Sequence, residues 1–140
     1  MDLQTQKKAG VIPVRILIVD DEGIFRNTLS RTLKQEGFEV VEAENAKVAR
    51  DLIGIETIDL VISDIRMPGG SGIELLHHVK SSKPNVPVIL MTGFSEIRET
   101  QQANDLGANG FLAKPFRKEE LLALIRTLVL GGAEYADATE

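Results

Sequence analysis

The sequence predicts an α/β fold in which helices cover both faces of a five-stranded parallel sheet. Two observations lead to this fold class. Short aliphatic runs of the kind found in fully buried parallel strands recur along the chain. Segments with the apolar spacing of helices separate these runs, and strict alternation of this kind is typical of a doubly wound sheet. The expected strands are Arg15–Val19, Phe38–Glu42, Asp59–Ser63, Val86–Met91 and Gly110–Ala113.

We expect the strand order 2-1-3-4-5, with the first and third strands at the point where the chain direction across the sheet reverses. The second strand, Phe38–Glu42, has charged residues between its apolar ones. Charges of this kind are suited to an edge strand, because one side of such a strand is open to solvent.

Five segments have the apolar periodicity of helices, and two of them differ from the others. Ser95–Leu106 has a thin apolar face, so we expect it to be weakly anchored. Lys118–Leu130 has more leucine than one face needs, which indicates either extra core or a partner surface. The other three helices are marked by Phe25, Leu29 and Leu33, by Val48, Leu52 and Ile53 behind the cap residue Asn45, and by Ile73, Leu76 and Val79.

Length and composition favour one ordinary globular domain. The chain has 140 residues, of which 43% are hydrophobic and 26% charged, and this balance argues against disorder. We expect the domain to span residues 14–130. We also expect a flexible N-terminal tail over 1–13 and a flexible tail or linker stub over 131–140, because both ends are polar.

The composition also excludes several functions. The formal net charge of −5 argues against direct binding of nucleic acid. The chain has no cysteine, so disulfides and thiolate catalysis are excluded. No apolar stretch approaches the roughly 20 residues of a membrane span, and the N-terminus lacks the apolar segment of a signal peptide. The expected location is the cytoplasm.

Charged and hydroxyl residues follow four of the five expected strands. Asp20 and Asp21 come directly after the first strand, and Asp64 follows the third. Thr92 follows the fourth strand, and Lys114 follows the fifth. Because the carboxyl ends of parallel strands meet at one edge of the sheet, we expect these five side chains to surround a single crevice.

These residue types suit a divalent metal and a phosphoryl group. Three carboxylates close together repel one another, and Mg²⁺, which prefers oxygen ligands, relieves that repulsion. A carboxylate such as Asp64 can also attack phosphorus and form an acyl phosphate. The charge of Lys114 and the hydroxyl of Thr92 can then bind phosphoryl oxygens. Each residue alone has an ordinary structural interpretation, so the prediction depends on all of them meeting at successive strand ends.

Together, the motifs around these residues resemble the receiver domain of two-component response regulators, over about residues 14–130, and hence a flavodoxin-like fold. The motifs are Ile16-Leu-Ile-Val-Asp-Asp-Glu22, Val61-Ile-Ser-Asp-Ile-Arg-Met-Pro-Gly-Gly-Ser-Gly72, Leu90-Met-Thr-Gly93 and Phe111-Leu-Ala-Lys-Pro115.

The resemblance implies a phosphoacceptor and a metal site. Asp64 would accept a phosphoryl group from a histidine kinase or a histidine phosphotransfer protein. Asp21 and Asp64 would bind Mg²⁺ or Mn²⁺ directly, Asp20 would act through water, and the backbone carbonyl of Arg66 would complete the protein ligands. Gly70 stands where the family usually has a bulkier residue, which indicates a looser loop after Asp64.

The resemblance further implies a signalling switch and not an enzyme. Thr92 and Lys114 would hold the phosphoryl oxygens, and Thr92 and Phe111 would move together on phosphorylation. The face formed by Ser95–Leu106, the strand of Phe111 and the helix Lys118–Leu130 would then change. A downstream protein would recognise this face, and a dimer could also form through it. The resemblance also implies a cis peptide bond between Lys114 and Pro115.

Three other classes stay open on the residues alone. A phosphohydrolase of the haloacid-dehalogenase type also uses an aspartyl phosphate, but its nucleophile follows the first strand, at Asp20 here. The short chain and the loop after Asp64 argue against it. An FMN-binding protein would place a phosphate where Asp20, Asp21 and Glu22 would repel it. An unphosphorylated, metal-free scaffold would leave the acidic set without a role.

Overall fold

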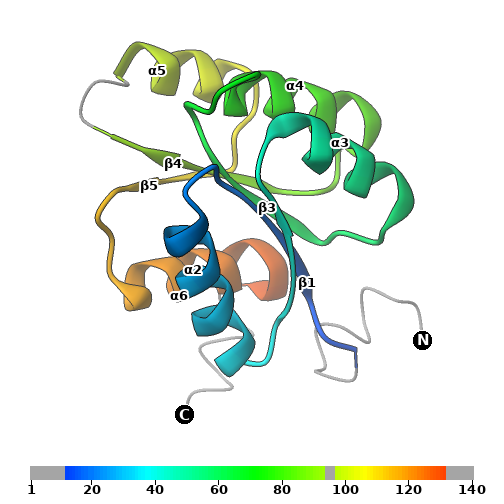
Figure 1. Ribbon diagram of the computed structural model, residues 1–140, viewed down its shortest axis with the longest axis vertical. Helices are drawn as coiled ribbons and strands as arrows, with labels where there is room; N and C mark the ends of the chain where they lie inside the picture. The colour runs from blue at the N-terminus through cyan, green and yellow to red at the C-terminus, as the bar shows by residue number, and fades with distance from the viewer. Residues whose placement is uncertain (1–11, 94–96, 132–140) are drawn as a thin grey trace.

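A parallel sheet with the strand order β2-β1-β3-β4-β5 forms the middle layer of the protein (Figure 1). The computed structural model describes residues 12–93 and 97–131. The predicted fold class and strand order are confirmed. The strands are β1 (Arg15–Val19), β2 (Glu39–Ala43), β3 (Leu60–Asp64), β4 (Val88–Thr92) and β5 (Gly110–Ala113).

Helices form the two outer layers (Figure 1). One face of the sheet is covered by α2 (Gly23–Gln35) and α6 (Lys118–Arg126), and α6 continues as a π-helical turn over Thr127–Gly131. The other face is covered by α3 (Ala46–Ile55), α4 (Gly72–Ser82) and α5 (Ile97–Asp105). The first residues of the segment predicted as Ser95–Leu106, and most of the tails predicted at 1–13 and 131–140, lie outside the described residues.

Strand β1 explains why its sequence is aliphatic throughout. Ile16 and Ile18 belong to the core cluster beneath α2 and α6, whereas Leu17 and Val19 belong to the cluster beneath the other three helices. Successive strand residues point to opposite faces, so a strand that is covered on both faces has no position for a solvated side chain. All four side chains are fully buried.

The last two helices along the chain, α5 and α6, are anchored very differently. Among the described side chains of α5, Ala103 is the one that is buried. The predicted thin apolar face is therefore present. In α6 and the turn that follows it, the described leucines and their apolar neighbours pack against the core cluster shared with α2. Leu121, Leu122 and Ile125 are buried core residues, whereas Leu124, Leu128 and Val129 pack against this core but are only partly buried, so a role of the surplus leucine in binding a partner stays open.

Side-chain caps start two of the helices on the α3–α5 face, α3 and α4. The Asn45 side chain accepts a hydrogen bond from the Val48 amide at 2.9 Å, as its predicted capping role requires. The Ser71 hydroxyl accepts one from the Glu74 amide at 3.1 Å and starts α4.

None of the helices within the described residues combines the length and apolar character that a membrane-spanning segment needs.

The start of α4 lies directly against the end of β3. The Gly72 amide donates a hydrogen bond to the carbonyl of Ile65 at 2.7 Å. A Cβ atom at Gly72 would overlap the backbone oxygen of Asp64. Glycine at this position therefore allows the loop after Asp64 to fold back onto the strand that carries it.

We predict that Gly72→Ala lowers the free energy of unfolding by about 2 kcal/mol, because the added methyl group must displace the backbone at Asp64. Gly54→Ala is the matched control, because a Cβ there would meet no atom within 4 Å beyond its chain neighbours and the backbone of its own helix. That variant should be more stable by about 0.5–1 kcal/mol, the usual gain for alanine in a helix. Urea unfolding measures both variants, and equal effects at the two glycines would contradict the close approach.

Candidate functional site

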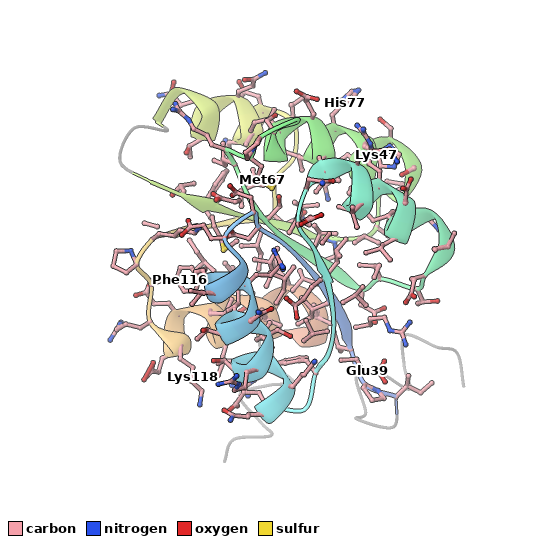
Figure 2. All side chains as sticks on the ribbon, in the orientation of Figure 1. Glu39, Lys47, Met67, His77, Phe116 and Lys118 are labelled. Carbon is pink, nitrogen blue, oxygen red and sulfur yellow. The ribbon has the colours of Figure 1, made fainter. Side chains whose placement is uncertain are left out.

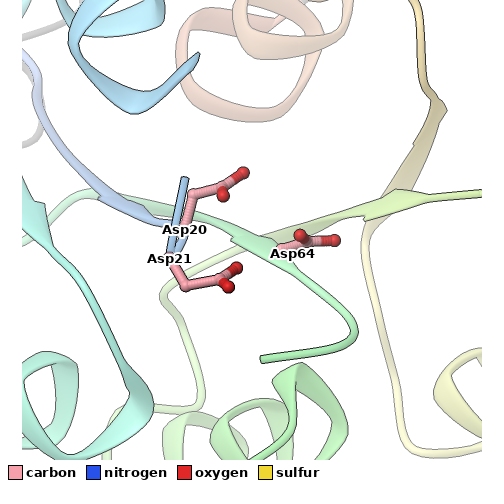
Figure 3. Close-up of side chains that lie close together, drawn as sticks. All are labelled: Asp20, Asp21 and Asp64. Atoms are coloured by element: carbon pink, nitrogen blue, oxygen red, sulfur yellow. The ribbon is translucent and has the colours of Figure 1, made fainter. Parts of the chain in front are cut away.

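Three aspartates meet at the carboxyl edge of the sheet. Asp20 and Asp21 follow β1, and Asp64 ends the neighbouring strand β3. One carboxylate oxygen from each lies within 4.8 Å of the others. Figure 3 shows the three side chains close together at the ends of the two strands. The predicted acidic cluster is therefore present in the folded chain.

The three carboxylates differ in burial. Asp20 is fully buried. Its Oδ1 accepts a hydrogen bond from the Glu22 amide at 2.8 Å, and its Oδ2 lies 3.0 Å from Lys114 Nζ. The Asp64 side chain is 13% exposed, and Asp21 is an exposed residue. The site is thus graded, from a carboxylate held inside the protein to one open to solvent.

Lys114 brings a positive charge to this cluster from the end of β5. Its Nζ lies 3.0 Å from Asp20 and 3.3 Å from Asp64, and 3.9 Å from the Glu22 carboxylate. Burial of the ammonium by itself lowers the pKa of Lys114, but the hydrogen bond with Asp20 and the charges of Asp64 and Asp20 outweigh burial and raise the pKa above its ordinary value. The Lys114–Pro115 peptide bond is cis, as the resemblance implied.

Thr92 ends β4, beside the other site residues but engaged elsewhere. Its hydroxyl donates to the Leu112 carbonyl at 3.5 Å, which is long for a hydrogen bond between oxygens. Its backbone carbonyl accepts a shorter bond, 2.8 Å, from the Lys114 amide. Phe111, one strand away, is half-buried and packs against the core cluster beneath α3, α4 and α5.

The loop after Asp64 is held by its apolar residues. Ile65 and Met67 are buried on either side of Arg66, which is exposed. Gly69 and Gly70 have φ values of +81° and +156°, a backbone region that residues other than glycine rarely adopt. These φ values explain why glycine occupies both positions, whereas the looser loop expected from Gly70 stays a prediction. The role of the Arg66 carbonyl stays a prediction.

Arg26 is a residue of the site that the sequence reasoning missed. Its guanidinium donates to the backbone carbonyl of Asp20 at 2.6 Å and lies 3.0 Å from the Glu42 carboxylate on β2. It therefore ties the turn that carries the acidic pair to α2 and to the edge strand. A cation one helical turn after an acidic pair was the available signal.

The donor set fits a hard divalent cation. Within the described residues, Asp20, Asp21 and Asp64 are the group able to hold a metal ion. All three offer carboxylate oxygens, the ligand type that Mg²⁺ and Mn²⁺ prefer. Three carboxylates face the single ammonium of Lys114, so a cation would also reduce their mutual repulsion.

Comparison with known proteins identifies the family. The model of the response regulator receiver domain matches residues 16–126, and the chain therefore belongs to this family. It is a signalling module of two-component systems and not a conventional enzyme.

Known proteins are similar to this chain in sequence and in structure. The chain is 37% identical over 118 residues to the response regulator MprA of Mycolicibacterium vanbaalenii, a match that covers 84% of this chain and 51% of MprA. It thus spans about half the length of that curated relative. Two solved structures are similar in fold. A CheY-like receiver domain protein of Methanospirillum hungatei has a TM-score of 0.82, with 28% identity and coverage of 90% of this chain and 99% of that one. The chemotaxis protein CheY4 of Vibrio cholerae has a TM-score of 0.78, with 30% identity and coverage of 84% and 99%.

We predict that Lys114→Met lowers the free energy of unfolding in EDTA by about 2 kcal/mol, because the buried Asp20 carboxylate loses its cation. The added cost of Asp20→Asn in the double variant should be smaller than its cost alone. Because the pKa of Lys114 is raised, the contribution is complete below the ordinary lysine pKa of about 10.4 and is lost as the pH rises through the raised value.

Lys118→Met is the control for this experiment. Lys118 also pairs with a carboxylate, Glu36, but its side chain is half exposed, so its loss should change stability by less than about 1 kcal/mol. Denaturant unfolding of the four variants gives the comparison. Strictly additive effects of the Lys114 and Asp20 substitutions would show that the two groups are not coupled.

Proposed function

We propose that Asp64 accepts a phosphoryl group from a histidine kinase or a histidine phosphotransfer protein, in a reaction that depends on Mg²⁺ or Mn²⁺. Phosphorylation then changes the face formed by α5, β5 and α6. The observation that carries this proposal is the arrangement of Asp64 between Asp21 and Lys114, with its side chain partly exposed.

Burial separates Asp64 from Asp20 as the candidate nucleophile. A phosphohydrolase that used the aspartate after the first strand would need Asp20 to reach its substrate. Asp20 is fully buried, and both of its oxygens have partners. An incoming phosphorus atom can approach Asp64 more readily. An FMN phosphate is also disfavoured, because the acidic side chains of Asp20 and Asp21 stand where it would have to bind.

The site residues divide the work with a metal ion. Asp21 and Asp64 would bind the ion directly, Asp20 would bind it through water, and the Arg66 carbonyl would complete the protein ligands. The bound ion would neutralise phosphoryl charge. The donor chemistry of the acidic cluster supports this assignment.

The transfer step requires little beyond positioning. A carboxylate oxygen of Asp64 forms a bond to phosphorus while the phosphorus–nitrogen bond of the donor phosphohistidine breaks, and the electron pair of that bond returns to the imidazole. Lys114 already lies 3.3 Å from an Asp64 oxygen and would pair with a phosphoryl oxygen. The Thr92 hydroxyl would donate to another.

The switch begins with the weak hydrogen bond of Thr92. Its hydroxyl can exchange the Leu112 carbonyl, at 3.5 Å, for a charged phosphoryl oxygen, which is a stronger acceptor. Phe111, on the adjacent strand, would follow by moving inward. The weakly anchored α5 would respond because it has little buried area to hold it, and the population of the protein would shift toward a second conformation.

The functional unit would be residues 14–130, acting in the cytoplasm, where histidine kinases of such systems deliver phosphoryl groups. A downstream protein or a second copy of the chain would bind the altered face formed by α5, β5 and α6.

We predict that Asp64→Asn abolishes phosphorylation by acetyl phosphate in the presence of Mg²⁺. Mass spectrometry of the intact protein should show one added phosphoryl group in the wild type and none in the variant. EDTA should suppress the reaction in the wild type. Asp51→Asn is the control, because Asp51 is exposed on α3, in an ion pair with Lys47. Normal phosphorylation of Asp64→Asn would overturn the assignment.

We predict that Thr92→Ala still becomes phosphorylated but loses most of its conformational response. Amide hydrogen exchange with and without beryllium fluoride, a phosphoryl mimic, measures this response. Protection should change in α5, β5 and α6 of the wild type and change little in the variant. Thr28→Ala serves as the control, because that hydroxyl bonds within α2 to Ile24. Changes confined to residues 22–54 would contradict the proposed face.

A further inference from the structure

An aromatic ring covers the ammonium group of Lys114. The Nζ atom lies 4.3 Å from the centroid of the Phe25 ring. A cation at this distance from a ring is attracted by the negative charge of the π face. The sequence had predicted Phe25 as a residue of the apolar helix face, and its ring does pack partly against the core cluster beneath α2 and α6. It therefore has a second contact, directed at the functional site.

A second ring supports the first. Phe116 meets Phe25 edge to face, with ring centroids 6.0 Å apart and an interplanar angle of 85°. Phe116 follows Lys114 by two residues and therefore lies on the same segment as the lysine. Its ring also packs partly against the core. Figure 2 shows Phe116 beside the first turns of α2. The two rings thus connect α2 to the segment between β5 and α6.

We propose that Phe25, supported by Phe116, is a positioning residue that holds the Lys114 ammonium at the place where a phosphoryl group on Asp64 would need it. The proposal rests on the proposed roles of Asp64 and Lys114.

The ring adds what the carboxylates alone do not provide. A lysine side chain has several rotatable bonds and a strongly hydrated ammonium, so it is poorly fixed unless it is packed. Its attraction to Asp20 and Asp64 weakens once a metal ion neutralises those carboxylates. The attraction to the Phe25 ring does not depend on the charge of the carboxylates. The ring therefore keeps the ammonium over the site after the metal has bound.

Three substitutions separate this role from ordinary packing. Phe25→Leu keeps an apolar side chain in the core but removes the π face. Phe25→Tyr keeps the ring and should restore the function. Ile24→Ala is the matched control in the same helical turn, because Ile24 is 87% exposed.

The first measurement is independent of phosphorylation. In the metal-free wild type, the ring current of Phe25 should shift the NMR signals of the Lys114 ε-methylene protons upfield. The shift should be lost in Phe25→Leu and kept in Phe25→Tyr and Ile24→Ala. The second measurement is the initial rate of Asp64 phosphorylation by acetyl phosphate at saturating Mg²⁺. Phe25→Leu should lower this rate about fivefold, as loss of a cation–π contact predicts, and Phe25→Tyr should recover it.

The possible outcomes are distinguishable. A wild-type rate in Phe25→Leu would overturn the proposal, whether or not the NMR shift is lost. A rate in Phe25→Tyr as low as that of Phe25→Leu would also overturn it, because Phe25→Tyr keeps the aromatic face, and the loss would then come from disturbed packing at this position. If Phe25→Leu does not fold, Phe116→Leu replaces it. That variant should reduce the shift and the rate in part, and no change in either would reject the supporting role. Absence of phosphorylation in the wild type would instead reject the proposed function of Asp64, while the NMR measurement would still test the contact.

Discussion

The mutual repulsion of three carboxylates is the constraint on which the site depends. Oxygen atoms of Asp20, Asp21 and Asp64 lie within 4.8 Å of one another, and the first of these residues is fully buried. A buried charge is tolerated when it is paired and hydrogen-bonded. The protein meets this requirement with the Lys114 ammonium and the Glu22 amide. The residues that hold the cluster together are therefore as important to the fold as they are to its chemistry.

These stabilising contacts come from distant parts of the chain. Lys114 lies 94 residues after Asp20 in the sequence. Arg26 reaches the same turn from α2 and extends to Glu42 on the edge strand. The site consequently joins β1, β2, β3 and β5, so a change of charge at Asp64 would alter electrostatic interactions of residues on several elements at once. This connection supports the view that local charge can bias the conformation of a whole face.

The two helices at the face where the response is proposed, α5 and α6, differ in how firmly they pack against the core. Helix α6 is held by a continuous set of leucine contacts, whereas the described part of α5 contributes Ala103 to the core. A helix with few buried contacts can rearrange at a small cost in free energy, and a firmly packed neighbouring helix preserves the rest of the fold during the change. Thr92 lies at the end of the strand that leads to α5, and its hydroxyl makes a long hydrogen bond, 3.5 Å, to the Leu112 carbonyl.

The amino-acid sequence by itself determined the strand order and brought out the charged and hydroxyl residues that follow the strands. Strands such as β1 are recognisable because burial on both faces demands an unbroken aliphatic run, and parallel strands bring their carboxyl ends to one edge. The positions of Asp20, Asp21, Asp64, Thr92 and Lys114 directly after or at the ends of successive strands therefore predict that they lie at one edge of the sheet.

The tertiary structure decided everything that depends on contacts between elements. Periodicity assigns Phe25 to an apolar helix face, but the rotation and approach of α2 bring its ring against Lys114. The same holds for the clamp made by Arg26 and for Gly72, whose missing side chain matters because the chain folds back onto Asp64. The burial of Asp20 beside a more accessible Asp64 also follows from packing. Local sequence sets which residues a helix or strand presents, whereas the distances between elements are fixed by how all the side chains pack at once.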